Sequence, residues 1–244
     1  MSGHSHAANI AAKKAKTDAA KGKIFTKVGR EIAVAAKSNP DPDTNSKLAD
    51  AIAKAKAVNM PNENIKRCIA KASGELSSDN YEELTYEGYG PAGSAVIIKT
   101  LTDNKNRTVD YVRTAMRKHG GSLGNSGCVS FTFTNMGMII IERTPDLDED
   151  TVMEYALDAG ADDFIAEDDA FEVHTSPAAF SSVRKYLEEK GLKFFSAQVE
   201  MVPQNVVTLS GDDLVKFNKL IDALEDLDDV QNVYHNVDIP EDEE

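Results

Sequence analysis

Apolar residues recur every three to four positions through the first 73 residues, which is the pattern of amphipathic helices. The stripes are Ile24, Val28, Ile32 and Ala35, then Leu48, Ile52 and Ala55, then Ile65, Cys68, Ile69 and Ala72. Pro40 and Pro42 separate the first stripe from the second, and either Thr44 or Asn45 can cap the second helix. Gly74 follows the third stripe, as is typical of a helix C-terminus. The pattern predicts a small domain of about three helices.

From residue 81 onward, short β-rich runs alternate with helical stripes. The first group comprises expected strands at 84–89, 95–101 and 128–134 and a helix at 108–119. The second comprises strands at 138–142, 162–167, 171–174 and 193–202 and helices at 148–159 and 177–190. This second order is β-α-β-β-α-β, the split βαβ order of ferredoxin-like domains. A last helix at 212–227 and strand at 230–237 have no sheet of their own, so we expect them to return to the first group.

The fold class predicted is therefore α+β: an N-terminal helical domain, then two ferredoxin-like α/β domains, the last inserted into the middle one. The expected domains are a helical basic domain at 1–74, a discontinuous α/β domain at 81–134 plus 205–238, an inserted βαββαβ domain at 135–204, and an acidic tail at 239–244. No apolar run approaches the roughly 20 residues of a bilayer span, so no membrane partner is expected.

Charge is divided unevenly along the 244 residues, whose formal net charge is −14. Residues 1–72 hold 14 lysines and arginines against six acidic residues, and the remainder holds 13 against 35. The total disfavours a nucleic-acid partner, because nucleic-acid-binding proteins are usually basic. The basic N-terminal part reverses that inference, since clustered cations release counterions from phosphates.

The candidate nucleic-acid-binding residues fall in two segments. They are Lys13, Lys14, Lys16, Lys21, Lys23, Lys27 and Arg30 in the first, and Asn104, Lys105, Asn106 and Arg107 in the second. The second segment joins a strand to a helix, where a helix N-terminus favours phosphate oxygens. The alternatives are a merely solvated helical face for the first segment and a polar N-cap, with Asn106 capping, for the second.

Other motifs give no catalytic arrangement. Gly88–Gly93 fits G-x-G-x-x-G but precedes a β-rich run, so a hairpin turn is expected rather than a dinucleotide site. His4 and His6 have no Cys or carboxylate beside them in the sequence. The pairs Asp162–Asp163 and Asp168–Asp169 are better explained as hairpin ends than as metal ligands. Cys68 and Cys128 are expected to be free thiols in a reducing cytoplasm. We expect no enzymatic activity, cofactor or metal.

Several segments together resemble the YebC/PmpR family, and the match runs from end to end of the chain. They include Gly3-His4-Ser5, Gly22–Lys27, Arg30-Glu31-Ile32, Asn59-Met60-Pro61, Asn64-Ile65, Tyr86–Pro91, Leu101–Thr108, Lys118–Gly124 and Val233–Asn236. The resemblance implies a helical N-terminal domain and two α/β domains, the last inserted into the middle one. It also implies a cytoplasmic, non-enzymatic regulator of gene expression.

The family resemblance leaves two partners open. Bacterial members are described as DNA-binding transcriptional regulators, and the family also has connections with translation and ribosomes. DNA is the first expectation, and a ribosome- or rRNA-associated translation factor is the alternative; the oligomeric state is open. The start of the chain departs from the family, which resembles Gly-His-Ser-Lys-Trp-Ala-Asn, because His6 and Ala7 replace the Lys and Trp. If the family's tip stacks on bases, we expect weaker affinity here.

Overall fold

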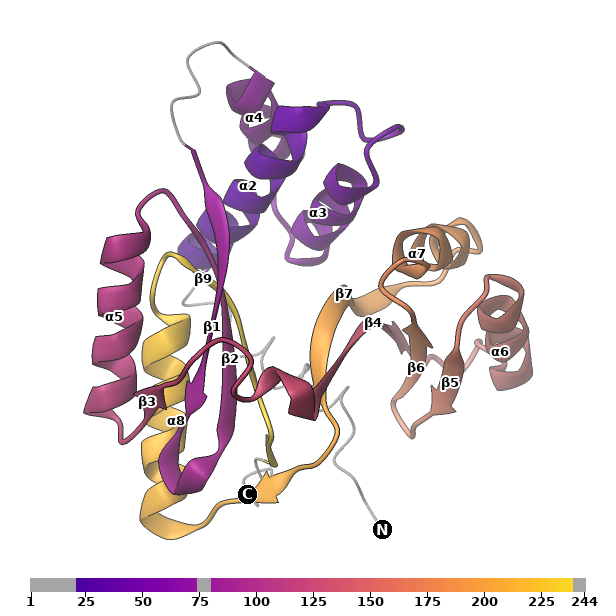
Figure 1. Ribbon diagram of the computed structural model, residues 1–244. Helices are drawn as coiled ribbons and strands as arrows, with labels where there is room; N and C mark the ends of the chain where they lie inside the picture. Colours follow the sequence, from indigo (N-terminus) through magenta and orange to yellow (C-terminus); the bar gives the residue numbers. More distant parts are fainter. Residues whose placement is uncertain (1–20, 74–79, 239–244) are drawn as a thin grey trace. The chain divides into compact units, whose positions relative to one another are not determined.

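The computed structural model describes residues 21–73 and 80–238 (Figure 1). These residues form two compact units, one of 21–73 with 135–200 and one of 80–134 with 201–238. Helices and mainly antiparallel sheets are combined in the chain, so the α+β class is confirmed. The predicted domain boundaries stay predictions, and the acidic tail 239–244 lies outside the described residues. None of the helices within the described ranges is both long and apolar enough to cross a membrane.

The helical part of the first unit consists of α2 (Lys21–Ser38), α3 (Ser46–Ala57) and α4 (Asn62–Ser73). Val28 and Ile32 of α2 pack with Leu48 of α3 and Ile65 of α4 in one buried cluster. Asn45 is the cap of α3, because its side chain accepts a hydrogen bond from the Leu48 backbone N–H. The predicted apolar stripes are therefore the faces that the three helices bury against one another.

The second unit is built on an antiparallel sheet with the strand order β3-β1-β2-β9. Its strands are β1 (Glu82–Tyr89), β2 (Ala95–Thr102), β3 (Ser122–Leu123) and β9 (Val230–His235), and its helices are α5 (Lys105–Lys118) and α8 (Gly211–Glu225). Ile98 of β2 lies opposite Val233 of β9. The last strand thus returns to the sheet that begins at residue 82. A short parallel pair, β8 (Val207–Thr208) and β10 (Val237–Asp238), follows the same return.

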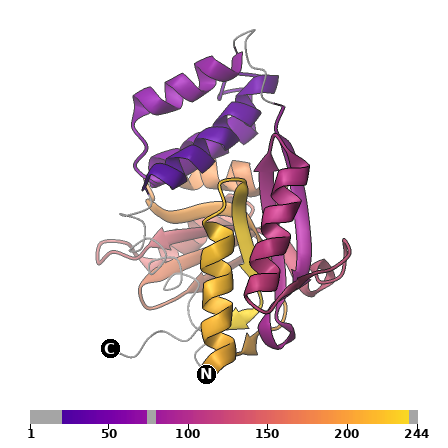
Figure 2. The ribbon, with the colours of Figure 1, turned by 90° about the vertical axis from the view of Figure 1, so that its left-hand side faces the viewer.

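Helices α5 and α8 lie side by side over one face of this sheet (Figure 2). Val96 and Ile98 of β2 pack there against Met116 of α5 and Phe217 of α8, and all four side chains are fully buried. The intervening residue Ile97 points to the opposite face, where it belongs to a second buried cluster. Because β2 is covered on both faces, it is apolar over consecutive positions rather than alternating.

The Gly-x-Gly-x-x-Gly segment is a hairpin turn, as the sequence predicts. Strands β1 and β2 are antiparallel, with Tyr89 opposite Ala95, and the turn η2 (Pro91–Gly93) joins them. The Gly90 N–H donates to the Ser94 carbonyl at 2.7 Å. The segment leads into a strand, so no helix N-terminus is available there for a pyrophosphate.

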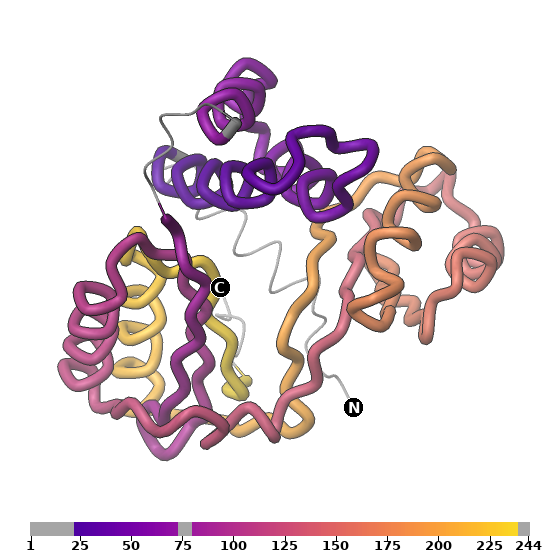
Figure 3. Tube along the Cα trace, turned by 45° about the horizontal axis from the view of Figure 1, so that its top comes forward, coloured from indigo at the N-terminus to yellow at the C-terminus, as the bar shows by residue number. Residues whose placement is uncertain are grey.

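Residues between β4 and β7 form the β-α-β-β-α-β order predicted for the insertion (Figure 3). The elements are β4 (Phe133–Glu142), α6 (Glu149–Asp158), β5 (Asp163–Ala166), β6 (Ala170–Thr175), α7 (Phe180–Glu189) and β7 (Phe194–Pro203). The sheet order is β5-β6-β4-β7, which places β4 and β7 side by side. Ile139 and Phe171 pack against Val183 and Leu187 of α7. This part of the first unit also joins α3, because Asp50 pairs with the buried Arg184 at 2.9 Å.

The strand predicted at 128–134 is wrong over its first half. Cys128 and Val129 lie in a loop, Ser130–Thr132 form the short helix η3, and β4 begins only at Phe133. The physical reason is a side chain distant in the sequence. The backbone N–H groups of Val129 and Ser130 donate to the Glu87 carboxylate instead of to a neighbouring strand.

Candidate nucleic-acid interface

The basic residues of α2 lie on one face of that helix. Lys23, Lys27 and Arg30 are spaced i, i+4 and i+7, so they project from the same side. Val28 and Ile32, which are buried, lie on the opposite side. Lys23 is exposed, whereas Lys27 and Arg30 are half-buried and all three engage in interactions within the chain. The apolar face fixes the helix on its neighbours and turns the basic face outward.

The structure covers only some of the residues predicted for the first segment. Lys21 lies in α2, but its side chain is outside the described part. Lys13, Lys14 and Lys16 also lie outside the described residues, so their part in nucleic-acid binding stays a prediction. Lys37, which the prediction omitted, is exposed and lies about four turns after Lys23 on the same face of α2. Its helical spacing was the signal that would have found it.

The helical part is basic as a whole, beyond the predicted residues. Within 21–73, 11 lysines and arginines stand against five acidic residues. Exposed cations on α3 and α4 contribute to this excess; they are Lys47, Lys56, Lys66, Arg67 and Lys71. Lys54 of α3 pairs with Glu31 of α2 at 2.8 Å. Such a surface suits a polyanion, because several phosphates can be neutralised together.

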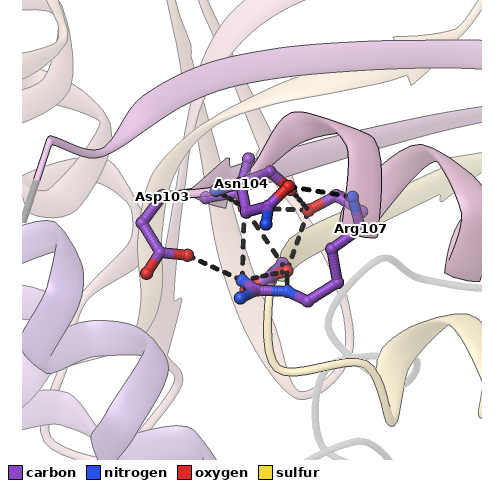
Figure 4. Close-up of polar contacts among 6 residues, drawn as sticks. Asp103, Asn104 and Arg107 are labelled. Atoms are coloured by element: carbon purple, nitrogen blue, oxygen red, sulfur yellow. Dashed lines mark hydrogen bonds and ion pairs between the residues drawn. The ribbon is translucent and has the colours of Figure 1, made fainter.

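The second predicted segment starts α5 (Figure 4). Asn104, not Asn106, is the cap: its side chain accepts a hydrogen bond from the Arg107 backbone N–H at 3.1 Å. The helix consequently begins at Lys105, three residues earlier than predicted. Lys105 and Asn106 are exposed, and Lys105 has one weak ion pair, 3.5 Å from Glu82. These two side chains are therefore accessible to a ligand.

Arg107 differs from its neighbours because its guanidinium binds within the fold. Its Nη2 atom lies 2.9 Å from Asp229 and 2.7 Å from Asp103. Asp229 is buried, and the Thr108 hydroxyl lies 2.8 Å from the same carboxylate. The hydrogen bonds that Arg107 donates to the Asp229 and Asp103 carboxylates raise its pKa. The guanidinium fastens α5 to the chain just before β9, so its part in binding is to hold this helix in place.

Sequence reasoning missed that α5 itself is basic. The helix carries Lys105, Arg107, Arg113, Arg117 and Lys118 against the single carboxylate of Asp110. It lies within the part of the chain that sums to strong acidity, so the regional total concealed it. Tyr111, in the middle of the same helix, is 54% exposed. A sequence window of about 14 residues, the length of one helix, would have shown the excess of cations and the tyrosine among them.

Glu87 was also missed, because nothing near it in the sequence marks it. Its buried carboxylate accepts hydrogen bonds from the backbone N–H groups of Gly127, Val129 and Ser130, at 2.8, 3.0 and 2.8 Å. Burial raises the pKa of Glu87, but these hydrogen bonds outweigh it and the pKa lies below its ordinary value. The carboxylate fixes the loop that leads into β4.

The two acidic pairs, Asp162–Asp163 and Asp168–Asp169, lie at the ends of β5. Asp162 precedes this strand, Asp163 is its first residue, and Asp168 and Asp169 occupy the turn before β6. Over the described ranges, no group of three or more His, Cys, Asp or Glu side chains is arranged to hold a metal ion. Cys68 and Cys128 are free thiols.

Comparison with known proteins covers nearly the whole chain. Residues 5–75 match the TACO1/YebC protein N-terminal domain, and residues 81–237 match the TACO1/YebC second and third domain. A protein of Acetivibrio thermocellus named "Probable transcriptional regulatory protein" is 60% identical over 238 residues, which cover 97% of this chain and 98% of that protein. A protein of the same name from Clostridium tetani is 56% identical over 242 residues, covering 99% and 98%.

A solved structure is also similar. The crystal structure of a conserved hypothetical protein from Aquifex aeolicus matches with a TM-score of 0.81 and 42% sequence identity, over 94% of this chain and 95% of that one. The matches to both family models and the high identity to these relatives thus confirm the family resemblance seen in the sequence. The chain belongs to the TACO1/YebC family.

Proposed function

We propose that this chain is a non-enzymatic, nucleic-acid-binding regulator of gene expression that contacts the phosphates of duplex DNA through its helical region. The observation that carries the proposal is the basic face of α2, where Lys23, Lys27 and Arg30 lie opposite the buried apolar face. Relatives of nearly the same length that are named probable transcriptional regulatory proteins support it. We expect it to act in the cytoplasm.

Binding of this kind is driven by counterion release rather than by base contacts. Each cation placed beside a phosphate releases condensed ions, so affinity falls as salt rises. The sequence of α2–α4 offers no obvious recognition helix with polar base-reading residues, so we expect little sequence specificity. The acidic remainder of the chain repels a polyanion and favours approach through the basic region.

Removal of cations from α2 is expected to weaken duplex binding in proportion to the number of phosphate contacts that are lost. The variant Lys23→Ala/Lys27→Ala should lower the salt slope of DNA binding by up to about two units. Fluorescence anisotropy with a labelled duplex at several salt concentrations measures it. The matched control is Lys185→Ala/Lys193→Ala, which removes two exposed cations elsewhere in the chain and should leave the slope unchanged. Equal slopes for the wild type and the α2 variant would contradict the proposal.

The cations before α2 are tested in the same assay. The variant Lys13→Ala/Lys14→Ala/Lys16→Ala should lower the slope by up to about three units. We expect the temperature of thermal unfolding to change little in this variant. Wild-type binding by this variant would restrict the interface to α2–α4.

A second candidate function is association with RNA in translation, and the basic helix α5 with its exposed Tyr111 favours it. Folded RNA presents unpaired bases as well as phosphates, which suits a cationic and aromatic surface. Co-sedimentation with ribosomes on sucrose gradients at low salt separates the two candidates. Recovery only in fractions without ribosomes would leave the DNA proposal standing and remove this one.

Catalysis is not part of the proposal. The acidic pairs around β5 are expected to be solvated hairpin ends without a bound cation. Isothermal titration calorimetry of the full chain with Mg²⁺ or Mn²⁺ should show no specific binding. A stoichiometric site lost in Asp162→Asn/Asp163→Asn would restore the enzymatic alternative.

A further inference from the structure

The exposed side of α5 combines an aromatic ring with several cations. Tyr111 is 54% exposed, and its ring has no aromatic or cationic partner among the described residues. An exposed Tyr on its own is ordinary, because apolar atoms make up much of any protein surface. Tyr111 stands out because α5 is strongly basic, whereas the neighbouring helix α8 carries more acidic than basic residues.

Helical spacing puts Lys118 on the same side of α5 as the ring, because Tyr111 and Lys118 are spaced i and i+7. Arg107 shares that side, but its guanidinium is bound by Asp103 and Asp229. Arg117 and Arg113 are exposed as well, but they lie about 120° and about 160° around the helix from Tyr111. Arg113 forms an ion pair with Asp110 at 3.1 Å, which is solvent-exposed and weak. The surface therefore keeps a net positive charge.

The ring is presented by a helix that is held rigidly at both its start and its inner face. Val112 and Met116 are fully buried against the sheet. At the start, Asn104 caps the helix and Arg107 binds the buried Asp229. A platform fixed in this way loses little conformational entropy on binding, which favours stacking on an exposed ring.

We propose that this face of α5 binds an unpaired RNA segment, with a base stacked on Tyr111 and the backbone phosphates beside Lys118 and Arg117. The proposal rests on the proposed function, since it assumes that the chain binds nucleic acid, and it names a second surface and a ligand class for it. A ring can stack on a base only where the base is not enclosed in a duplex, and such bases are characteristic of RNA loops and ends. Cations at helical spacing accompany the strand without reading its sequence.

The experiment compares unpaired and duplex ligands on the full chain. The probe is a fluorescein-labelled oligouridylate of about 12 nucleotides, within the range that single-strand sites cover. We expect Tyr111→Ala to weaken oligouridylate binding by about 5- to 150-fold, the equivalent of one lost stack, and to leave duplex DNA binding unchanged. Tyr111→Phe keeps the ring and should bind as the wild type does.

Two controls separate stacking from folding and from general charge. Val215→Ala removes an exposed apolar side chain from the neighbouring helix α8 and should leave binding intact. Tyr111→Ala, Tyr111→Phe and Val215→Ala should all unfold at the wild-type temperature, because the altered side chains are largely exposed. Arg117→Gln/Lys118→Gln should reduce the salt slope for oligouridylate by up to about 1.4 units.

Three outcomes would overturn the inference: wild-type oligouridylate affinity in Tyr111→Ala, an equal loss of duplex binding in that variant, or tighter binding of oligothymidylate DNA than of oligouridylate. None of these affects the proposed function, which the α2 variants and the duplex test decide separately. Loss of duplex binding in the α2 variants together with wild-type behaviour of Tyr111→Ala would leave one surface, on the helical region.

Discussion

Replacing Glu87 with alanine is expected to lower the free energy of unfolding at neutral pH by about 3–5 kcal/mol, because one buried and two part-buried N–H groups lose a charged acceptor. The loop before β4 should loosen as well, which faster amide hydrogen exchange at Val129 and Ser130 would detect. Urea unfolding measures the free energy. The matched control is Glu83→Ala, four residues earlier on β1 and exposed, which should change stability by less than about 0.5 kcal/mol.

The effect of Glu87 should depend on pH in a defined direction. Its pKa is lowered in the folded chain, so the ionised form stabilises the fold above the unfolded pKa of about 4.3. That contribution is lost as the pH falls from about 4.3 through the lower folded pKa. Glu87→Gln has no such titration, so its stability should approach that of the wild type in acid. A stability difference that stays constant from neutral pH to pH values near 3 would exclude this account of Glu87.

Disrupting the ion pair between Arg107 and Asp229 is also expected to lower the free energy of unfolding substantially. Asp229→Ala is expected to destabilise the chain by about 2–4 kcal/mol, because Arg107 loses a buried partner and the Thr108 hydroxyl loses one of its acceptors. Arg107→Ala leaves a buried carboxylate without its counter-ion and should cost a similar amount. Chemical unfolding of both single variants and the double variant gives the coupling free energy.

The control for this cycle is on the same helix. Asp110 and Arg113 form an exposed pair at 3.1 Å, whose coupling should not exceed about 0.5 kcal/mol. A coupling between Arg107 and Asp229 as small as that of the exposed pair would show that the guanidinium does not fasten α5. Arg107 would then be available to a ligand, as the sequence first indicated.

The sequence predicted elements well where the signal was local. The stripe of Val28 and Ile32 on α2 and the cap by Asn45 on α3 need only residues within one or two turns. The return of β9 to β2 could also be predicted, since the last strand had no other partner. The first two predictions depend on a pattern within a short segment, and the third depends on the order of the predicted elements along the chain.

Predictions failed where a side chain acts over a long distance in the sequence. Val129 has the β-branched character of a strand residue, but its N–H is taken by Glu87, 42 residues earlier. Arg107 looks like a phosphate ligand beside a helix start, yet its carboxylate partner Asp229 comes 122 residues later. No window of local sequence contains either partner, so the roles of these residues required the folded chain.

The pairing of β2 with β9 has a consequence for the order in which the chain is synthesised. The Ala95 N–H donates to the side chain of Asn236, which lies 141 residues later. At translation rates of roughly 5–20 residues per second, about 7–28 s pass between the synthesis of β2 and the synthesis of β9, its second neighbour in the sheet. During that interval one edge of an apolar strand is unpaired, and such edges invite association with other chains. A nascent chain truncated before β9 should therefore depend on chaperones far more than the finished protein does.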